Sequence, residues 1–299
     1  MYLSYSGDDT YRTCPRQYYH QYIARTKPIK PDNRVNMLYG DVVGKLFERF
    51  YVDRLWTKDP AGELQALVVP TLKRVIANEI RKGGVFDWSD KAFKNGPYSL
   101  EEVEREVRET IPRGLQAIKH HRLMGLDLQC EMNLEVLLEG HKIGGRADFV
   151  MTRVKPHGDL VIVDGKGSKY RDLYTNHRQL RWYAMQHRLK LGTTPTRLGF
   201  LFWRSVPEES MDWTLVEPEA LDALQTSVLA TATEISEAEA EIAKGENPLR
   251  LFPATPGPDC KRCSYFDQCI EGKQAHSKEA KAEMKADLLR GVEDGEISF

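Results

Sequence analysis

The stretch Leu160-Val161-Ile162-Val163-Asp164-Gly165-Lys166 decides the fold class of this chain. Its apolar run has a strong preference for β structure and predicts a strand that is buried on both faces of a sheet. Two charged residues end the strand, and charges in such a place usually serve a purpose. Because Asp164 and Lys166 are two positions apart, we expect their side chains on the same face of the sheet.

Further strands and helices are expected on both sides of this stretch. A tight turn at Glu139-Gly140 joins two strands before it, and Gly144-Gly145 in the second of them predict a bulge or a close backbone approach. The expected strands cover residues 134–138, 141–151, 160–164, 197–204 and 211–216. The expected helices cover residues 8–25, 39–56, 64–80, 100–123, 172–191, 219–244 and 274–289, with Pro15 in a first turn and Gly192 as a helix end.

The order of these elements predicts an α/β fold. Helices come first, then three strands, a helix and two more strands, and finally a long helix and a tail that contains cysteines. We expect a mixed central sheet flanked by helices, with a helical element built from both ends of the chain. The expected divisions are an N-terminal helical segment (1–35), the core (36–245), a cysteine segment (246–272) and an exposed helical and acidic tail (273–299).

The composition is that of an ordinary globular protein. The chain has 299 residues, is 41% hydrophobic and carries a net charge of −1. It has neither an apolar run long enough for a membrane nor a secretory signal, so we expect a cytoplasmic protein without disulfides. The charge is uneven, since residues 166–190 hold seven Lys or Arg and one acid, Asp172. This stretch is either a solvated helix face or a surface for phosphates.

Three charged residues form the main candidate site. Asp148 lies in the motif Gly145-Arg-Ala-Asp148-Phe149, on the strand before Asp164 and Lys166. Carboxylate oxygens are ligands for Mg²⁺ or Mn²⁺, and a bound metal can polarise a phosphate and activate water. A lysine can orient that water or stabilise the developing charge. The set therefore indicates phosphodiester hydrolysis; the alternative is a surface Asp–Lys pair with Asp148 in a turn.

A helix after these strands carries Gln179 and Tyr183, which are four residues apart and share one face. With Asp148, Asp164 and Lys166, this series resembles the core of the PD-(D/E)xK nuclease superfamily in its RecB-like branch. The resemblance implies that Asp148 and Asp164 bind metal, together with the carbonyl group of Gly165. It also implies that Lys166 is the catalytic lysine and that Gln179 and Tyr183 support the active site.

The helix before the sheet departs from the family pattern Gly-x-x-x-His-x-x-x-Glu. It reads Gly40-Asp-Val-Val-Gly44-Lys-Leu-Phe-Glu48, with glycine in place of the histidine that binds metal in relatives. Glu48 is then expected to take over as a ligand, or the enzyme to hold one ion fewer. Glu131 is a further acid that can face the pocket. The departure also leaves open a catalytically weak protein that binds DNA or acts as an adaptor.

Four of the five cysteines form a second candidate site. Cys260-x-x-Cys263 is followed five residues later by Cys269, and such spacing lets sulfurs share one metal group. The segment around Cys14 resembles the N-terminal cysteine segment of AddB-type and CRISPR-associated RecB-like nucleases. That resemblance implies a [4Fe–4S] cluster on these four cysteines; the alternatives are zinc and unrelated thiols. Cys130 is expected to be a core residue.

The predicted function is that of a metal-dependent deoxyribonuclease. The resemblance implies an exonuclease on single-stranded or duplex DNA ends, acting in recombination, repair, or phage or CRISPR DNA processing. DNA is the expected partner, recombination or CRISPR-adaptation proteins are further candidates, and a membrane is not expected. The residues expected to contact DNA are Arg12, Arg16, Lys169, Arg178 and Arg181.

Overall fold

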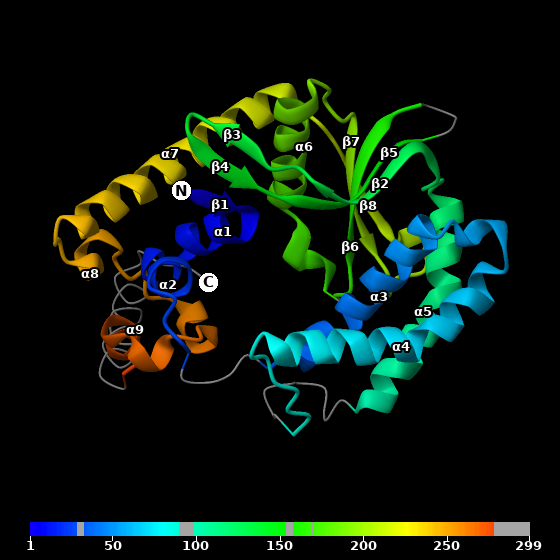
Figure 1. Ribbon diagram of the computed structural model, residues 1–299, viewed down its shortest axis with the longest axis horizontal. Coiled ribbons are helices and arrows are strands. Elements are labelled where there is room, and N and C mark those ends of the chain that lie inside the picture. The colour runs from blue at the N-terminus through cyan, green and yellow to red at the C-terminus, as the bar shows by residue number, and fades with distance from the viewer. Residues whose placement is uncertain (29–32, 90–98, 154–157, 169, 278–299) are drawn as a thin grey trace, which may run out of the picture. The chain divides into compact units, whose positions relative to one another are not determined.

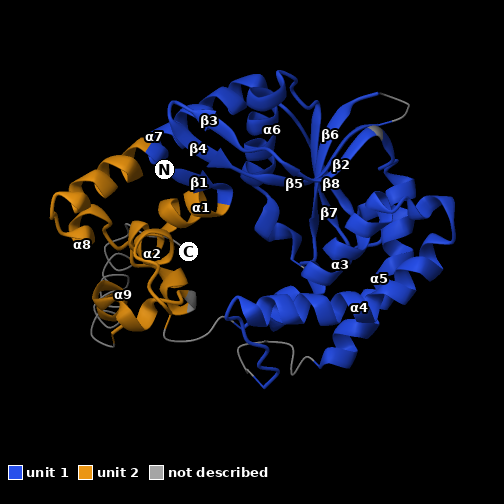
Figure 2. Ribbon diagram, viewed as in Figure 1, with its two compact units in different colours: residues 1–5, 31–232 blue, residues 6–30, 233–299 orange. Residues whose placement is uncertain are grey.

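The computed structural model describes residues 1–28, 33–89, 99–153, 158–168 and 170–277. The chain divides into two compact units, which Figure 2 shows in different colours. The first contains Met1–Tyr5 and Pro31–Ala232, and the second contains Ser6–Lys30 and Thr233–Phe299. Both ends of the chain therefore contribute to the second unit. None of the described helices is long and apolar enough to cross a membrane.

A five-stranded mixed sheet forms the centre of the first unit (Figure 1). Its strands lie in the order β2-β5-β6-β7-β8, and of these neighbours only β6 and β7 run parallel. Helix α6 connects the two parallel strands. The mixed α/β fold that the sequence predicts is confirmed. The strands are β2 (Gly125–Asn133), β5 (Arg146–Arg153), β6 (Leu160–Lys166), β7 (Arg197–Phe202) and β8 (Met211–Leu215).

A second, three-stranded sheet corrects the predicted hairpin. Strands β3 (Val136–Leu138) and β4 (His141–Gly144) pair with each other, and β1 (Tyr2–Ser4) runs parallel to β4. The strand predicted at 141–151 is in fact divided at Gly144-Gly145, where the chain passes from this sheet to β5. A Cβ on Gly145 would lie 2.0 Å from Oε1 of Gln186, so this glycine makes room for a side chain and not for another backbone segment.

Strand β2 was not predicted, although residues 126–133 of its sequence, Leu-Asp-Leu-Gln-Cys-Glu-Met-Asn, alternate strictly between apolar and polar residues. Asp127 and Glu131 within it have φ angles of +52° and +50°, and the pairing with β5 shifts between Leu126 and Gln129. These are local departures from regular strand geometry, which the alternating sequence does not reveal.

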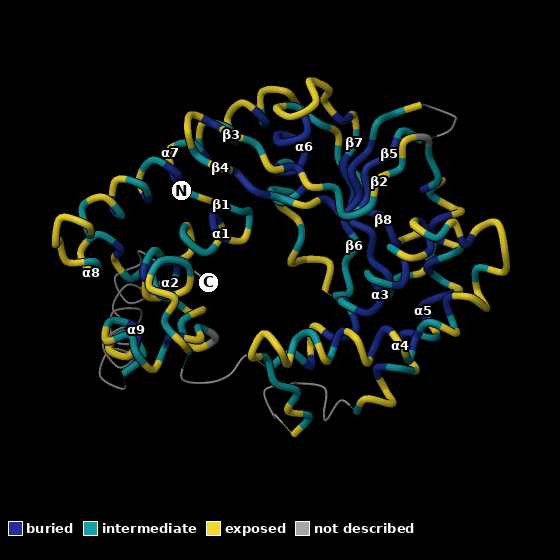
Figure 3. The backbone as a smooth tube through the Cα atoms, in the orientation of Figure 1, coloured by how far each residue is buried: buried dark blue, intermediate teal, exposed yellow. Residues whose placement is uncertain are grey.

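Helix α3 (Val35–Val52) packs on one side of the large sheet, and α4 (Pro60–Arg81) and α5 (Leu100–His120) pack on α3. Helix α6 (Arg178–Leu191) lies on the other side of the sheet (Figure 1). Val161 and Val163 of β6 belong to the same buried cluster as α3, whose inner face is dark in Figure 3. The rings of Phe47 and Trp203 stack at 4.2 Å. Ser99 and Glu102 form a capping box that fixes the start of α5.

The helix predicted from residue 172 begins later in the structure. A short 3₁₀ helix, η3 (Arg171–Tyr174), precedes α6, and His177 between them has a φ of +46°. Gly192 ends α6 in the left-handed conformation, as predicted. Two further short 3₁₀ helices of this unit are η2 (Leu55–Thr57) and η4 (Pro207–Glu209).

The second unit is built from short helices around aromatic side chains. The helix predicted at 8–25 is broken at Cys14, whose extended backbone begins α2 with Pro15 in its first turn. Tyr18 stacks on Tyr22 and Phe252. The elements are α1 (Tyr5–Thr13), α2 (Pro15–Tyr18), the π-helix η1 (Tyr19–Ile23), α7 (Pro218–Ala243), which passes from the first unit into the second, α8 (Pro248–Leu251), η5 (Pro258–Arg262), η6 (Phe266–Gln268) and α9 (Ile270–Ala275). The helix predicted at 274–289 lies mostly outside the described residues.

Replacing Leu46 by alanine tests the packing of α3 on the sheet. Leu46 is fully buried, so Leu46→Ala should lower the free energy of unfolding by about 2–5 kcal/mol, as measured by urea denaturation. Val52→Ala on the same helix is the control, because Val52 is 60% exposed and its loss should change stability by less than about 0.5 kcal/mol. Equal effects of the two substitutions would contradict this packing.

Candidate functional site

The end of β6 brings Asp164 and Lys166 together, as their spacing predicts. Nζ of Lys166 lies 2.6 Å from Oδ2 of Asp164, and both side chains are largely buried. A buried ion pair is costly to desolvate and is weak evidence for stability alone. Its presence at the end of a buried strand therefore favours a functional role.

Helix α6 holds this pair in place through Gln179. The amide oxygen of Gln179 accepts a hydrogen bond of 2.7 Å from Nζ of Lys166. Its Nε2 donates to Oδ1 of Asp164 at 3.3 Å and to the hydroxyl oxygen of Tyr183 at 2.9 Å. The polar atoms of Gln179 thus orient the carboxylate and the ammonium, and Tyr183 fixes the amide in turn. The structure brings these four residues together.

Asp148 joins the pair from the neighbouring strand β5. Its Oδ2 accepts a hydrogen bond of 2.8 Å from the backbone N–H of Gly165. Desolvation raises the pKa of the Asp148 carboxyl well above its usual range, and the nearby charge of Asp164 raises it further. Burial also raises the pKa of Asp164, against the opposing effect of Lys166. Two carboxylates this close to each other favour a cation between them.

Glu131 and Glu48 extend the acidic group. The pairs Cys130–Phe149 and Met132–Ala147 on either side put Glu131 opposite Asp148 across the β2–β5 ladder. The charge of Glu131 contributes to the raised pKa values of both aspartates. Lys45 on α3 donates hydrogen bonds to Glu48 and to Glu131, at 2.6 and 2.8 Å.

Two aromatic rings lie against the lysine of the site. Nζ of Lys166 is 5.0 Å from the ring centre of Tyr174 and 5.1 Å from that of Phe200. His177 stacks on Phe200, and its Nε2 lies 2.9 Å from Oδ2 of Asp212. Four residues of this surrounding were not predicted from the sequence: Lys45, Tyr174, Phe200 and His177. Of these four residues, only Lys45 has a recognisable sequence pattern, because it precedes Glu48 by three residues on a helix and such residues can pair.

Glycines let the backbone segments of the site come close together. A Cβ on Gly165 would lie 2.6 Å from Nε1 of Trp203, and one on Gly167 would lie 2.5 Å from Cα of Gly40. Gly40 therefore allows α3 to meet the end of β6. A Cβ on Gly44, by contrast, would have nothing within 4 Å, so the position where relatives carry histidine opens onto free space.

The donor set fits a hard divalent cation. Mg²⁺ in proteins is usually bound by one or two carboxylates, with water and substrate phosphate as the other ligands. Asp148 and Asp164 supply such a pair, and Oδ2 of Asp164 is buried with an ion pair to Lys166 but without a well-directed hydrogen bond in the described part of the chain. Within those residues no three His, Cys, Asp or Glu side chains are grouped closely enough to enclose a metal ion. Two carboxylates that leave room for water and phosphate match Mg²⁺ or Mn²⁺ better than they match a metal that is fully enclosed by protein ligands.

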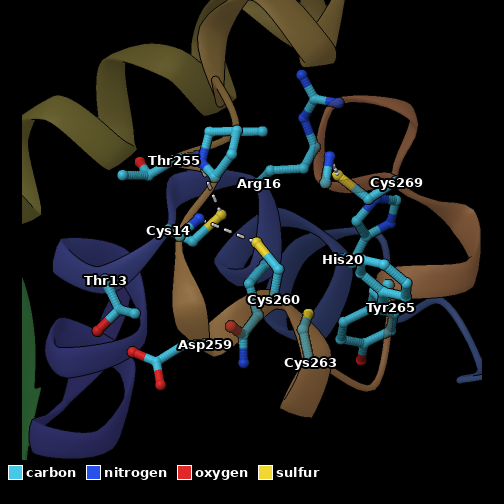
Figure 4. Close-up of a pocket in the computed structure, with 16 residues that line it drawn as sticks. Thr13, Cys14, Arg16, His20, Thr255, Asp259, Cys260, Cys263, Tyr265 and Cys269 are labelled. Carbon is cyan, nitrogen blue, oxygen red and sulfur yellow. Dashed lines mark hydrogen bonds between the residues drawn. The ribbon is translucent and has the colours of Figure 1, made fainter. Parts of the chain in front are cut away.

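The second unit gathers the four cysteines that the spacing selects. Cys14, Cys260, Cys263 and Cys269 line one cavity of about 220 Å³, drawn in Figure 4. Backbone N–H groups of Thr255, Gly257 and Gly272 donate to three of the sulfurs, those of Cys14, Cys260 and Cys269. Burial raises the pKa of the Cys263 thiol, and the other three cysteines raise it further.

Arg16 has a different role from the predicted contact with DNA. It is buried, and its guanidinium donates to the carbonyl oxygens of Phe252 and Leu249, at 2.7 Å each. It also pairs with Glu271 at 3.1 Å. Because these partners occupy the guanidinium, Arg16 fixes the segment that carries the cysteines and is not available to a phosphate.

The other predicted DNA contacts are distributed over both units. Arg178 and Arg181 are partly exposed at the start of α6, and Arg12 is exposed on α1. Lys169 lies outside the described residues. Cys130 packs against the buried cluster of the first unit, and burial raises the pKa of its thiol to about 12. This agrees with the core role that the sequence analysis gives it.

Comparison with known protein families matches this arrangement to one of them. The model of the PD-(D/E)XK nuclease superfamily matches residues 2–270. The chain belongs to this superfamily. Its members use divalent metals such as Mg²⁺ or Mn²⁺, in agreement with the carboxylate pair on β5 and β6. The RecB-like iron–sulfur subtype is a finer assignment that this match does not make.

Solved structures show only distant likeness, and no curated protein matches the chain. One is a candidate exonuclease from Eubacterium rectale, at 16% identity over 76% of this chain and 77% of that one, with a TM-score of 0.42. Another is the protein SSO0001, at 14% identity over 57% of this chain and 75% of that one, with a TM-score of 0.27.

Asp148→Asn should reveal the repulsion within the site when no metal is bound. A carboxyl with a raised pKa destabilises the folded state while it is ionised, and this effect disappears as pH falls through the raised value toward about 4. In EDTA the variant should therefore unfold a few degrees above the wild type at pH 8. The difference should shrink as the pH is lowered to 5 and below.

Thermal unfolding followed by circular dichroism across this pH range measures the difference. A variant that is less stable than the wild type at pH 8 in EDTA would show that Asp148 is not strained by its neighbours.

Proposed function

We propose that the protein is a metal-dependent nuclease that hydrolyses phosphodiester bonds of DNA. The observation that carries the proposal is the contact of Lys166 with Asp164 and Gln179, beside Asp148, in a member of this nuclease superfamily. A divalent ion held by the two aspartates, with the Gly165 carbonyl as a further candidate ligand, would polarise the phosphate and lower the pKa of the attacking water. Glu48, the further ligand expected from the sequence, is instead held by Lys45 at 2.6 Å.

The residues of the chain supply the remaining parts of the reaction. Gln179 and Asp164 hold the ammonium of Lys166, which can donate to the attacking water or to a phosphate oxygen. The water oxygen forms the new bond to phosphorus, the bond to the sugar oxygen breaks, and that oxygen takes up a proton. Tyr174 and Phe200 lie against Lys166 and limit the directions in which its side chain can move.

The proposed substrate is a DNA end. Arg178 and Arg181 begin the helix that carries Gln179, so cations adjoin the proposed reaction centre. We further propose exonuclease action in DNA recombination or repair, as the resemblance to RecB-like nucleases implies. Linear and circular DNA distinguish this mode, because an exonuclease requires an end.

Cleavage of end-labelled linear DNA should require Mg²⁺ or Mn²⁺ and stop in EDTA. Lys166→Met and Asp164→Asn should each lower the rate by about 10²–10⁴-fold, because each removes a group that acts in the transition state. Lys119→Met is the matched control, since Lys119 is exposed on α5, and should cleave at the wild-type rate.

Equal rates in Lys166→Met and wild-type protein would contradict the proposed site. A folded protein that binds DNA and cleaves neither linear nor circular substrates would instead favour the DNA-binding or adaptor alternative. The replacement of histidine by Gly44 would then be the first cause to examine.

We also propose that Cys14, Cys260, Cys263 and Cys269 hold a [4Fe–4S] cluster. Zinc in a structural site has Zn–S distances of about 2.3 Å, which bring the sulfurs close together. The four cysteines line one cavity of about 220 Å³, and the early cysteine with the late Cys-x-x-Cys and Cys269 resembles the cysteine pattern of the iron–sulfur nucleases. N–H groups that donate to sulfur are a recurrent feature around iron–sulfur clusters and tune their potential.

Anaerobically purified protein should be brown, absorb at about 400 nm and contain iron and sulfide. Cys263→Ser should lose this absorbance, while Cys130→Ser should keep it because Cys130 lies in the core of the first unit. Stoichiometric zinc without iron would contradict the cluster, as would retention of the absorbance in Cys263→Ser.

A further inference from the structure

Lys45 makes a contact in the acidic site that neither the family pattern nor the sequence analysis assigns. Its ammonium lies between two carboxylates, 2.6 Å from Oε2 of Glu48 and 2.8 Å from Oε1 of Glu131. The three side chains are 27–42% exposed, so solvent and ions reach them. Lys45 thus occupies the position between these oxygens that a metal ion would need.

The backbone of Glu131 is bent in a way that serves this contact. Glu131 has a φ of +50° inside a strand, a conformation that costs energy for any residue other than glycine. It stands opposite Asp148 on the next strand. Backbone strain of this kind persists where surrounding contacts hold it in place. Here the strained residue is Glu131, whose carboxylate is held by Lys45 next to Asp148.

The charges of the site fall into two sets. Asp148 and Asp164 lie beside a single cation, Lys166, whose ammonium is 2.6 Å from Asp164, so one ammonium faces two carboxylates. Glu48 and Glu131 share Lys45, and Arg146 adds a more distant contact to Glu131 at 3.6 Å. The inner set therefore keeps an excess of negative charge, whereas the outer set is balanced by residues of the chain.

We propose that Lys45 is a built-in cation that takes the place of a second divalent ion, so that the site binds one metal instead of two. The inference rests on the proposed nuclease function. Lys45 is a positioning residue in this account, because it acts through Glu48 and Glu131. Gly44 next to it leaves free space and offers no competing ligand, so the two adjacent positions together favour a single ion.

The number of bound Mn²⁺ ions tests the proposal without measuring activity. Protein freed of divalent metals is titrated with Mn²⁺, and free Mn²⁺ is counted by electron paramagnetic resonance. Wild-type protein should bind one ion, and Asp164→Asn should lose it. Lys45→Met should gain a second ion, because Glu48 and Glu131 become free to bind it. Lys45→Arg keeps the charge and should stay at one, and Lys119→Met controls for the loss of a surface lysine.

The double variant Lys45→Met/Glu131→Gln should return to one ion, which shows that the second ion uses this carboxylate. Circular dichroism establishes that each variant is folded. Two ions in wild-type protein, or one ion in a folded Lys45→Met, would overturn the role of Lys45 and leave the proposed nuclease site intact. Absence of Mn²⁺ binding in every protein would overturn both.

Discussion

The ion pair between Asp164 and Lys166 is the interaction on which the rest of the site depends. It stands at the end of β6, a strand whose apolar residues are buried between two covered faces. Such a pair can stay charged there only if other groups compensate for the water it has lost. Gln179 on α6 meets both partners, and Gly165 and Gly167 let neighbouring backbone and rings approach. Chain segments that are distant in the sequence are thus organised around two charges.

The role of the acidic residues depends on the negative charge that no cation of the chain offsets. Asp148 is held beside Asp164 by the N–H of Gly165, and the two carboxylates raise the cost of ionising each other. A divalent ion relieves that repulsion, so the unfavourable arrangement favours metal binding. The outer carboxylates differ, because Lys45 already satisfies them. The inner carboxylates, Asp148 and Asp164, therefore keep an excess of negative charge, whereas the outer carboxylates, Glu48 and Glu131, are offset by a cation of the chain.

The sequence predicts the parts of the molecule in which local pattern and tertiary structure agree. Regular local patterns predicted two elements that the structure contains: the apolar run predicted β6, and the helical spacing predicted α3. The cysteine spacing predicted a group of cysteines, and these line one cavity. Where tertiary contacts override local pattern, the prediction is wrong or silent. The 141–151 segment is such a case, because it changes sheets at a pair of glycines. Strand β2 differs, since it was missed although residues 126–133 alternate between apolar and polar.

The same distinction explains which residues of the site could be predicted from the sequence. Asp164 and Lys166 share one strand, and Gln179 and Tyr183 share one helix, so a linear pattern reveals each pair. Asp148 lies on another strand and was found through its motif Gly145-Arg-Ala-Asp148-Phe149. Lys45 and Glu131 meet across 86 positions, and Tyr174 and Phe200 reach Lys166 from separate elements. Arg16 was mistaken for a DNA contact because its burial depends on Phe252 and Leu249, far along the chain.

A crystal structure of the Lys166→Met variant with Mn²⁺ and a short DNA oligonucleotide tests the central claim most directly. Anomalous scattering from manganese locates the ion without reference to activity, and the variant preserves the uncleaved strand. We expect a manganese peak bound by Asp148 and Asp164, with a phosphate of the DNA on the same ion. A manganese peak away from these carboxylates, or DNA bound on a surface that leaves them untouched, would contradict it.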